Sequence, residues 1–335
     1  MSEDNLSFLP EKFDVIFFDG VGVPYIGSTP RLGGLGGSEF QTILVAEGLV
    51  KAKLNVACFN NTPFAAKENG VWYFPIDTLR YRKWKTKTLV TMRNSQLPMQ
   101  YVDTERLFIW VTDLPGQHYN IIDKIAVEYP DTTLIAVSKW HHDIFSTPLK
   151  KVFIHNGIPD YVYDVKSTRT KELTKFIYAS AAMKGLKDTI SFFKTMKKDY
   201  FFKKAELTIL SPGYDSPDKE TLADKKLVFK GALPFQDVVK ELASSNAMLY
   251  VNTMPETFGI SPVIAEIVGA TPFVLFTQHA GALPEVLNSD HIMSNPELMY
   301  EHLVEFSKNP GQARVEAKDF RSSKIMPLWR ELLGV

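Results

Sequence analysis

The amino-acid sequence predicts two α/β domains of similar size. Short runs of β-branched and aromatic residues alternate with longer amphipathic segments, which is the pattern of parallel α/β folds. Several of these runs are apolar at consecutive positions, as expected for strands that helices cover on both faces of a sheet. The chain has 335 residues, and since a domain takes about 150 residues, its length accommodates two cores.

In the first half of the chain, seven runs have the composition of strands. They are Phe13–Phe18, Leu54–Phe59, Val71–Phe74, Lys87–Thr91, Leu107–Val111, Thr133–Val137 and Val152–Ile154. A helix is expected to begin at Ser38, because Ser38 and Gln41 have the spacing of a capping box.

The second half repeats the alternation after a Gly/Pro turn at Asn156-Gly157-Ile158-Pro159 and a polar stretch. Its expected strands are Lys175–Tyr178, Glu206–Leu210, Lys226–Phe229, Ala247–Val251 and Phe273–Phe276, and its expected helices are Leu186–Met196, Phe235–Ser244, Pro262–Val268 and Gly281–Leu287. We therefore expect domains at residues 1–157 and 158–312, with a helical segment at 313–335. A cleft between two such domains is the default ligand site.

Composition and charge exclude several classes of protein. Lys plus Arg and Asp plus Glu are both 38, so the basic excess typical of duplex DNA binding is absent and nucleic acid is not the expected partner. The single cysteine, Cys58, excludes an intramolecular disulfide and a cysteine-based zinc site. No His-x-x-x-His pair or carboxylate cluster suggests another metal site.

The location expected from the sequence is the cytoplasm, with contact to a membrane surface left open. The acidic N-terminus is followed by no apolar segment of the kind that a signal peptide needs. The most apolar long stretch, Val263–Phe276, is too short to span a bilayer and contains Glu266 and Pro272.

Residues 80–87 (Arg-Tyr-Arg-Lys-Trp-Lys-Thr-Lys) concentrate five basic side chains around two aromatic ones. A solvated edge of the domain is the expected interpretation. An anionic acceptor, a membrane surface or a nucleic acid are the alternatives.

A glycine-rich loop, Gly33-Gly34-Leu35-Gly36-Gly37-Ser38, opens the first helix. Glycines allow a ligand to approach the backbone, and amides at a helix N-terminus attract phosphate or sugar oxygens. The loop from Asp19 to Gly33 is too long for the dinucleotide-binding fingerprint. The alternative is a flexible surface loop.

Two strand–helix loops of the second domain carry charged residues. Lys184, in Lys184-Gly185-Leu186, can point its ammonium group at a diphosphate held over a helix start, although solvated lysines are common there. Glu256, in Pro255-Glu256-Thr257-Phe258-Gly259-Ile260, can accept hydrogen bonds from two sugar hydroxyls, or it can simply favour the helix N-terminus electrostatically.

Taken in order, these motifs resemble a known family. The sequence has Gly-Gly-Ser-Glu after the first strand, Ile154-His155-Asn156-Gly157-Ile158 at the domain junction, Lys184-Gly185-Leu186, Glu256-x-Phe-Gly, and Gly281…Glu285, with Phe108–Asp113 and Val137–His141 as further matches. In this it is similar to the retaining, nucleotide-sugar-dependent glycosyltransferases of family 4, which have the GT-B fold.

The resemblance implies a fold and an activity. It implies two Rossmann-like domains facing a cleft, with residues 1–157 binding the acceptor, 158–312 binding the nucleotide sugar, and a C-terminal helix crossing back to the first domain. The enzyme would be a metal-independent hexosyltransferase that needs no cofactor. Its donor would be UDP- or GDP-linked, and its acceptor a glycan, a lipid-linked molecule or a small molecule.

The resemblance also implies roles for individual residues. Lys184 would neutralise the leaving diphosphate, and Glu256 would hold the transferred sugar. The further donor-binding residues implied are Gly36, Gly37, Ser38, Ser180, Phe258, Gly259, Ile260, Glu266 and Glu285. Of these, Gly36, Gly37 and Ser38 would lie near the donor phosphates or the acceptor. The residues implied at the acceptor or in the cleft are Thr112, Asp113 and His118.

Three departures from the family pattern leave other functions open. The second family Glu is replaced by Ile264, with Glu266 two residues beyond it. Ala181 and Ala182 lie where the family has an Arg, and Thr112 precedes Asp113 where a His is frequent. The alternatives are a nucleotide-sugar-binding protein impaired in turnover and another GT-B enzyme, such as a sugar-nucleotide epimerase.

Overall fold

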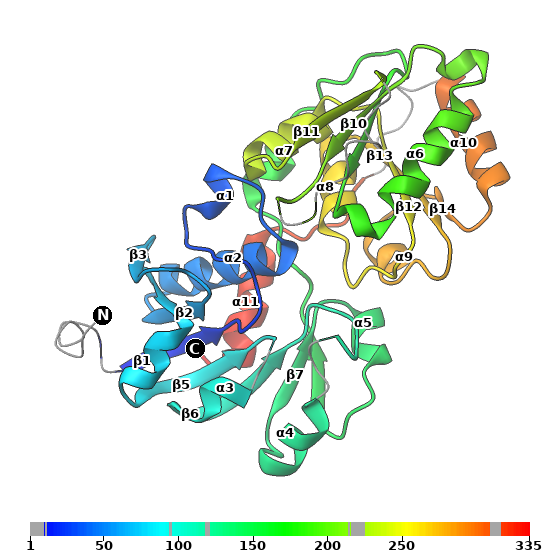
Figure 1. Cartoon of the computed structure of the whole chain (residues 1–335). Coiled ribbons are helices and arrows are strands. Elements are labelled where there is room, and N and C mark those ends of the chain that lie inside the picture. The colour runs from blue at the N-terminus through cyan, green and yellow to red at the C-terminus, as the bar shows by residue number, and fades with distance from the viewer. Residues whose placement is uncertain are drawn as a thin grey trace. The chain divides into compact units, whose positions relative to one another are not determined.

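The chain folds into two compact units (Figure 1). The computed structural model describes residues 10, 12–93, 96–117, 121–213, 215, 225–308 and 316–335. Unit 1 contains the described residues up to Thr29 together with Gly36–Gly157 and Ser322–Val335. Unit 2 contains Pro30–Leu35 and Ile158–Arg321. The chain thus leaves unit 1 twice, briefly at Pro30–Leu35 and then from Ile158 to Arg321.

Unit 1 is built on an eight-stranded sheet of order β3-β4-β2-β1-β5-β6-β7-β8. Its strands are β1 (Lys12–Phe18), β2 (Val56–Asn60), β3 (Ala66–Glu68), β4 (Val71–Pro75), β5 (Trp84–Thr91), β6 (Val102–Trp110), β7 (Thr133–Ala136) and β8 (Lys150–Phe153). Only the β3–β4 pair is antiparallel among these described strands. The parallel α/β architecture expected from the sequence is confirmed.

Helices cover this sheet, and the C-terminal helix is one of them (Figure 1). The helices of unit 1 are α2 (Gly37–Lys51), α3 (Gln96–Met99), α4 (Ile122–Glu128), α5 (Lys139–Ile144) and α11 (Ser322–Leu333), with a 3-10 turn at Ile76–Tyr81. The short helix α1 (Thr29–Leu32) begins at the last residue of unit 1 before Pro30, and its other residues belong to unit 2. Helix α11 packs closely against α2. Gly48 of α2 allows this contact, because a Cβ there would lie only 2.6 Å from the sulfur of Met326 in α11. The Trp329 ring meets Trp110 edge-on at 4.7 Å between ring centroids.

Strands β5 and β6 begin earlier than the sequence predicted, at Trp84 and Val102 instead of Lys87 and Leu107. Their first halves are charged, so the apolar pattern did not mark them. Buried and exposed residues alternate at the start of β5, as they do when one face of a sheet meets solvent. At the start of β6 only Val102 is buried. The basic run 80–87 therefore includes the start of a strand.

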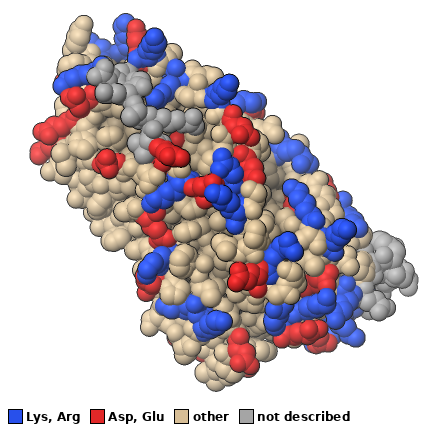
Figure 2. Space-filling view, turned by 180° about the vertical axis from the view of Figure 1, so that it is seen from behind, with Lys and Arg blue, Asp and Glu red and all other residues tan. Residues whose placement is uncertain are grey.

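Two of the five basic residues of this run form ion pairs with acidic neighbours. Lys83 lies 3.3 Å from Asp103, and Lys87 lies 2.8 Å from Asp14, while the Arg82 guanidinium stacks over the Trp84 ring. Basic and acidic side chains are also interspersed on the face shown in Figure 2. Among the residues that the structure describes, no helix is long and apolar enough to cross a membrane.

The predicted capping box at the start of α2 is wrong. The helix begins at Gly37 with Gly36 as its N-cap, and no side chain caps it. The Ser38 hydroxyl instead donates to the Thr112 hydroxyl at 2.9 Å. The Gln41 amide exchanges two hydrogen bonds of 2.9 Å with the backbone of Gly157. The side chains of Ser38 and Gln41, which the local pattern assigned to the cap, thus form tertiary hydrogen bonds instead.

Unit 2 contains a six-stranded parallel sheet of order β11-β10-β9-β12-β13-β14. Its strands are β9 (Lys175–Ala179), β10 (Glu206–Leu210), β11 (Leu227–Gly231), β12 (Ala247–Asn252), β13 (Thr271–Phe276) and β14 (Ile292–Met293). Its helices are α6 (Leu186–Met196), α7 (Phe235–Ala243), α8 (Ile260–Val268), α9 (Leu283–Val286) and α10 (Pro296–Lys308), with 3-10 turns at Asp160–Asp164, Ala182–Lys184 and Tyr200–Phe202.

Counted from β9, the strand order of unit 2 is 3-2-1-4-5-6, the doubly wound order of Rossmann-like sheets. The direction of winding reverses between β9 and β12, which are neighbours in the sheet. In such sheets the loops after these two strands border a crevice at their carboxyl ends, where ligands bind. The fold therefore directs attention to residues 180–185 and 253–259.

Candidate active site

Lys184 is held at the carboxyl end of β9 by a tight turn. The 3-10 turn Ala182–Lys184 ends at Gly185, whose φ is +111°. A Cβ on Gly185 would lie 1.9 Å from the Val251 carbonyl oxygen, so only glycine allows the turn to approach β12 this closely. This contact brings the side chain of Lys184 toward the end of the neighbouring strand.

Glu256 is fixed by its backbone in the loop between β12 and α8. It forms an isolated parallel bridge with Gly281, and its carbonyl oxygen accepts the Ala282 amide at 2.8 Å. Gly281 has a φ of +68°, and a Cβ there would lie 2.2 Å from the Glu256 carbonyl oxygen. The segment before α9 thus locks the backbone that carries the carboxylate.

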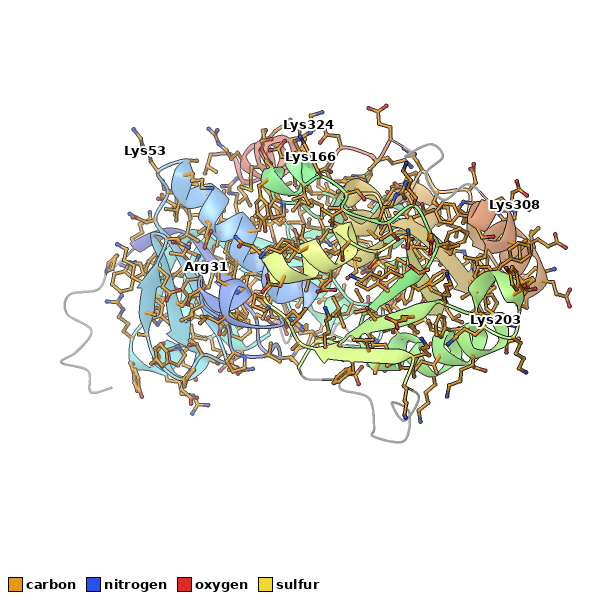
Figure 3. All side chains as sticks on the ribbon, turned by 90° about the horizontal axis from the view of Figure 1, so that it is seen from above. Arg31, Lys53, Lys166, Lys203, Lys308 and Lys324 are labelled. Atoms are coloured by element: carbon orange, nitrogen blue, oxygen red, sulfur yellow. The ribbon has the colours of Figure 1, made fainter. Side chains whose placement is uncertain are left out.

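The structure brings Lys184 and Glu256 together. The Lys184 ammonium lies 2.9 Å from Oε1 and 3.0 Å from Oε2 of Glu256. The hydroxyl of Tyr250, in β12, donates to Oε1 at 2.5 Å. Glu256 is buried, whereas Lys184 is partly exposed. By contrast, Lys203 and Lys308, labelled in Figure 3, lie at the exposed edge of the structure.

Two buried tyrosines, Tyr178 and Tyr250, lie next to this pair, and the sequence analysis assigned no role to either. The rings of Tyr178 and Tyr250 pack edge-on, with 5.8 Å between their centroids. The Tyr178 hydroxyl donates to the Ala181 carbonyl oxygen at 2.6 Å. Ser180, which is half-buried, follows β9 directly and precedes Ala181 in the same loop. Burial, with the charge of Glu256, raises the pKa of both phenols, so each stays a neutral donor.

Residues near the start of α8 lie in the same loop as Glu256. Gly259 is the N-cap of α8 with a φ of +87°, and Ile260 is the first helical residue. The first amides of a helix have no intrahelical acceptor, so this end can donate to an anion. The Phe258 ring is buried and packs edge-on against Phe320 at 5.2 Å. Phe258 thus anchors the loop.

Glu266 and Glu285 lie in other surroundings. Both carboxylate oxygens of Glu266 accept a hydrogen bond from the backbone N–H of Asn288, at 3.0 and 3.1 Å. A small cavity lies beside Glu266, and Arg169 is among the residues that line it. Burial raises the pKa of Glu266. The carboxylate therefore binds the segment after α9. Glu285 is half-buried in α9, and its carbonyl oxygen accepts the Lys318 ammonium at 2.5 Å.

The predicted residues of unit 1 gather at the carboxyl end of its own sheet. Gly36, Gly37 and Ser38 open α2, and Ser38 bonds to Thr112 after β6. The backbone carbonyl of Asp113 is 2.9 Å from Nε2 of His141. Burial lowers the pKa of His141 to about 4, so this imidazole is neutral. His118 lies outside the described residues.

A buried ion cluster beside them was missed by the sequence analysis. Arg93 donates to both oxygens of Asp19, at 3.1 and 2.7 Å, and to Glu39 at 2.7 Å. Burial lowers the pKa of the Arg93 guanidinium, but the negative charges of Asp19 and Glu39 have the larger combined effect and raise this pKa. Asp19 and Arg93 each follow a strand of the sheet closely, β1 and β5, and this position is the signal that could have found them.

Comparisons with known proteins show the fold. No family model matches the sequence, and no curated protein matches it. A sucrose-phosphate synthase from Thermosynechococcus elongatus matches with a TM-score of 0.67 and 12% identity, over 96% of this chain and 99% of that one. The Anabaena protein HepE in complex with UDP and glucose matches with the same values.

WaaG, a glycosyltransferase involved in lipopolysaccharide biosynthesis, matches with a TM-score of 0.61 and 13% identity, over 95% of this chain and 94% of that one. These likenesses extend over nearly the whole chain, so they include both sheets. The chain has the GT-B fold, as the sequence predicted.

Proposed function

We propose that this protein is a retaining glycosyltransferase that moves a sugar from a nucleoside diphosphate to an acceptor hydroxyl. The observation that carries the proposal is the meeting of Lys184 and Glu256 at the switch point of the unit 2 sheet. An ammonium group suits a diphosphate, and a carboxylate suits sugar hydroxyls. The likeness to HepE, solved with UDP and glucose, supports this assignment.

In the proposed reaction, the bond between the anomeric carbon and the diphosphate oxygen breaks. The acceptor oxygen bonds to the same face of that carbon, so the configuration is retained. The acceptor proton passes to an oxygen of the departing diphosphate, which acts as the base. Lys184 and the amides at the start of α8 stabilise the charge that develops on this leaving group, without a metal ion. Glu256 orients the sugar.

Unit 1 would bind the acceptor. Ser38, Thr112 and Asp113 offer hydroxyl and carboxylate groups at the end of its sheet, which suits a polyhydroxylated molecule such as a glycan, whether free or lipid-linked. The donor would carry UDP or GDP, and the protein would act in the cytoplasm without a cofactor.

A thermal-shift screen tests donor binding first. UDP, GDP, ADP and TDP and their glucose derivatives are added to the full chain, and the correct donor raises the melting temperature according to its affinity. Products formed with the positive donor are then analysed with and without an acceptor panel. Failure of all eight compounds to bind would contradict the proposal, and conversion of the donor sugar without any acceptor would indicate an epimerase.

A binding protein without turnover is the second candidate. It is favoured by Ile264, which is buried in α8 where the family has an acidic residue, and by Ala181, a residue without a charged group in the loop after β9. Binding of a nucleotide sugar without hydrolysis or transfer across the acceptor panel would support this candidate.

A further inference from the structure

The carboxylate of Glu256 has two partners of different character. Lys184 stands on a flexible stem with 35% of its side chain exposed. Tyr250 is completely buried in β12, and its ring packs against Tyr178. One partner can therefore move toward a ligand, while the other is held by the core.

An anionic ligand at this site would compete with Glu256 for the Lys184 ammonium. The side chain of Glu256 is only 8% exposed, so solvent cannot replace a lost partner well. A buried carboxylate without a hydrogen-bond donor is costly. The Tyr250 hydroxyl, 2.5 Å from Oε1, is the donor that remains in place when Lys184 turns away.

We propose that Tyr250 is a positioning residue that holds the Glu256 carboxylate in place while a diphosphate draws Lys184 away from it. Tyr250 touches no ligand in this arrangement and acts through Glu256. The bond lowers the cost of separating Lys184 from Glu256, and it keeps the carboxylate oriented for the sugar. The identity of the anion as a nucleoside diphosphate rests on the proposed function.

A mutant cycle with UDP as the ligand tests this coupling. Calorimetry measures UDP affinity for the wild type, Tyr250→Phe, Glu256→Gln and the double variant. Tyr250→Phe is expected to weaken UDP binding about tenfold, the scale of one hydrogen bond to a charged group. In the Glu256→Gln background the same substitution should change the affinity less than twofold, because no carboxylate is left to support.

The matched control is Tyr73→Phe. Tyr73 is a buried tyrosine of unit 1 whose hydroxyl has no hydrogen-bond partner among the described residues, so its removal should leave UDP affinity unchanged. Wild-type affinity in Tyr250→Phe would overturn the proposal. An equal tenfold loss in the Glu256→Gln background would also overturn it, because the effect would then be a general disturbance of packing.

A second cycle needs no ligand. Replacing Lys184 with Met imitates its departure, so Tyr250→Phe should raise the unfolding equilibrium constant about tenfold more in the Lys184→Met background than in the wild type. Equal effects in both backgrounds would overturn the inference. This cycle remains decisive if the wild type binds no nucleotide, a result that would contradict the proposed function alone.

A crystal structure of the wild type with UDP gives the same test if Tyr250→Phe does not fold. The expected result is Lys184 at a phosphate oxygen, with the bond between Tyr250 and Glu256 retained. Lys184 still on both oxygens of Glu256 would overturn the proposal.

Discussion

The two sheets each place a cation against carboxylates at their carboxyl ends, but the two arrangements differ in burial. In unit 1 the Arg93 side chain is 10% exposed and contacts three carboxylates, those of Asp19 and Glu39 at 2.7 Å and that of Asp113 at 4.0 Å. The Asp19 side chain is completely buried. In unit 2 the Lys184 side chain is 35% exposed and contacts one. Arg93 has fixed bidentate geometry, whereas Lys184 has a mobile point charge.

This difference separates a closed ion cluster from the proposed donor site. The unit 1 cluster connects the ends of β1 and β5 with α2, and a Cβ on Gly22 would meet atoms of Asp19, Glu39 and Arg93 within 2.8 Å. No space is left there for a ligand beside Gly22. In unit 2 the buried Tyr250 contacts the Glu256 carboxylate, whereas the partly exposed Lys184 side chain leaves the pair accessible to solvent.

Arg93→Met should give the largest effect on stability. It leaves two carboxylates buried without their cation, which costs about 3–5 kcal/mol in comparable cases. The measurement is the free energy of unfolding in urea, with Arg80→Met as the control because Arg80 is exposed. A loss below about 1 kcal/mol would show that Asp19 and Glu39 do not depend on Arg93.

Lys184→Ala should lower transfer activity tenfold or more, while destabilising the fold much less than Arg93→Met. The ammonium is proposed to stabilise the leaving group, whereas Glu256 keeps its bond to Tyr250 in the variant. Initial rates with the donor found in the screen measure the effect, and Lys203→Ala, at the exposed position in Figure 3, is the control. Unchanged turnover would remove Lys184 from the mechanism.

The sequence predicted the residues of the unit 2 site unequally, for a physical reason. Lys184 and Glu256 lie in loops whose glycines and prolines are visible as motifs, so their order along the chain could be interpreted. Tyr250 and Tyr178 lie inside buried strands, where an aromatic residue has the pattern of core, and only the fold shows what the hydroxyl meets. The contacts of Ser38 and Gln41 were likewise decided by tertiary structure.

Glu266 is the opposite case, a residue that the sequence analysis proposed for the donor site and that the structure shows in other contacts. The sequence made it a candidate for the donor site because it is the acidic residue nearest Ile264, but spacing along a helix does not show which neighbour a side chain meets. In the structure its carboxylate accepts a hydrogen bond from the backbone N–H of Asn288. The role of Glu266 at the donor therefore has no support from its contacts, and it remains a prediction.

The neutral His141 of unit 1 should make stability depend on pH. Its pKa is about 4 in the folded protein and near 6.5 in the unfolded chain, because burial disfavours the charged imidazole. The unfolded state therefore binds the proton first, and stability is lost as pH falls from 6.5 toward 4. Between pH 6.5 and 5.5 the loss is about 1 kcal/mol from this group.

Urea unfolding at a series of pH values measures this loss, with His141→Gln as the comparison. The variant should lose less stability than the wild type over the same interval. His291, whose pKa burial and His302 also lower to about 4, contributes a second loss that the variant retains. Parallel pH curves for the two proteins would contradict the buried, neutral state of His141.

The smallest effect is expected for the exposed ion pair between Lys83 and Asp103. Both side chains are more than half exposed, so solvent and salt screen their attraction, in contrast to the Arg93 cluster. Lys83→Ser should change the free energy of unfolding by less than about 0.5 kcal/mol. A larger loss that disappears in high salt would show that the charged start of β5 depends on its ion pairs for pairing with β6. The contrast with the Arg93 cluster would then lie in geometry and not in burial.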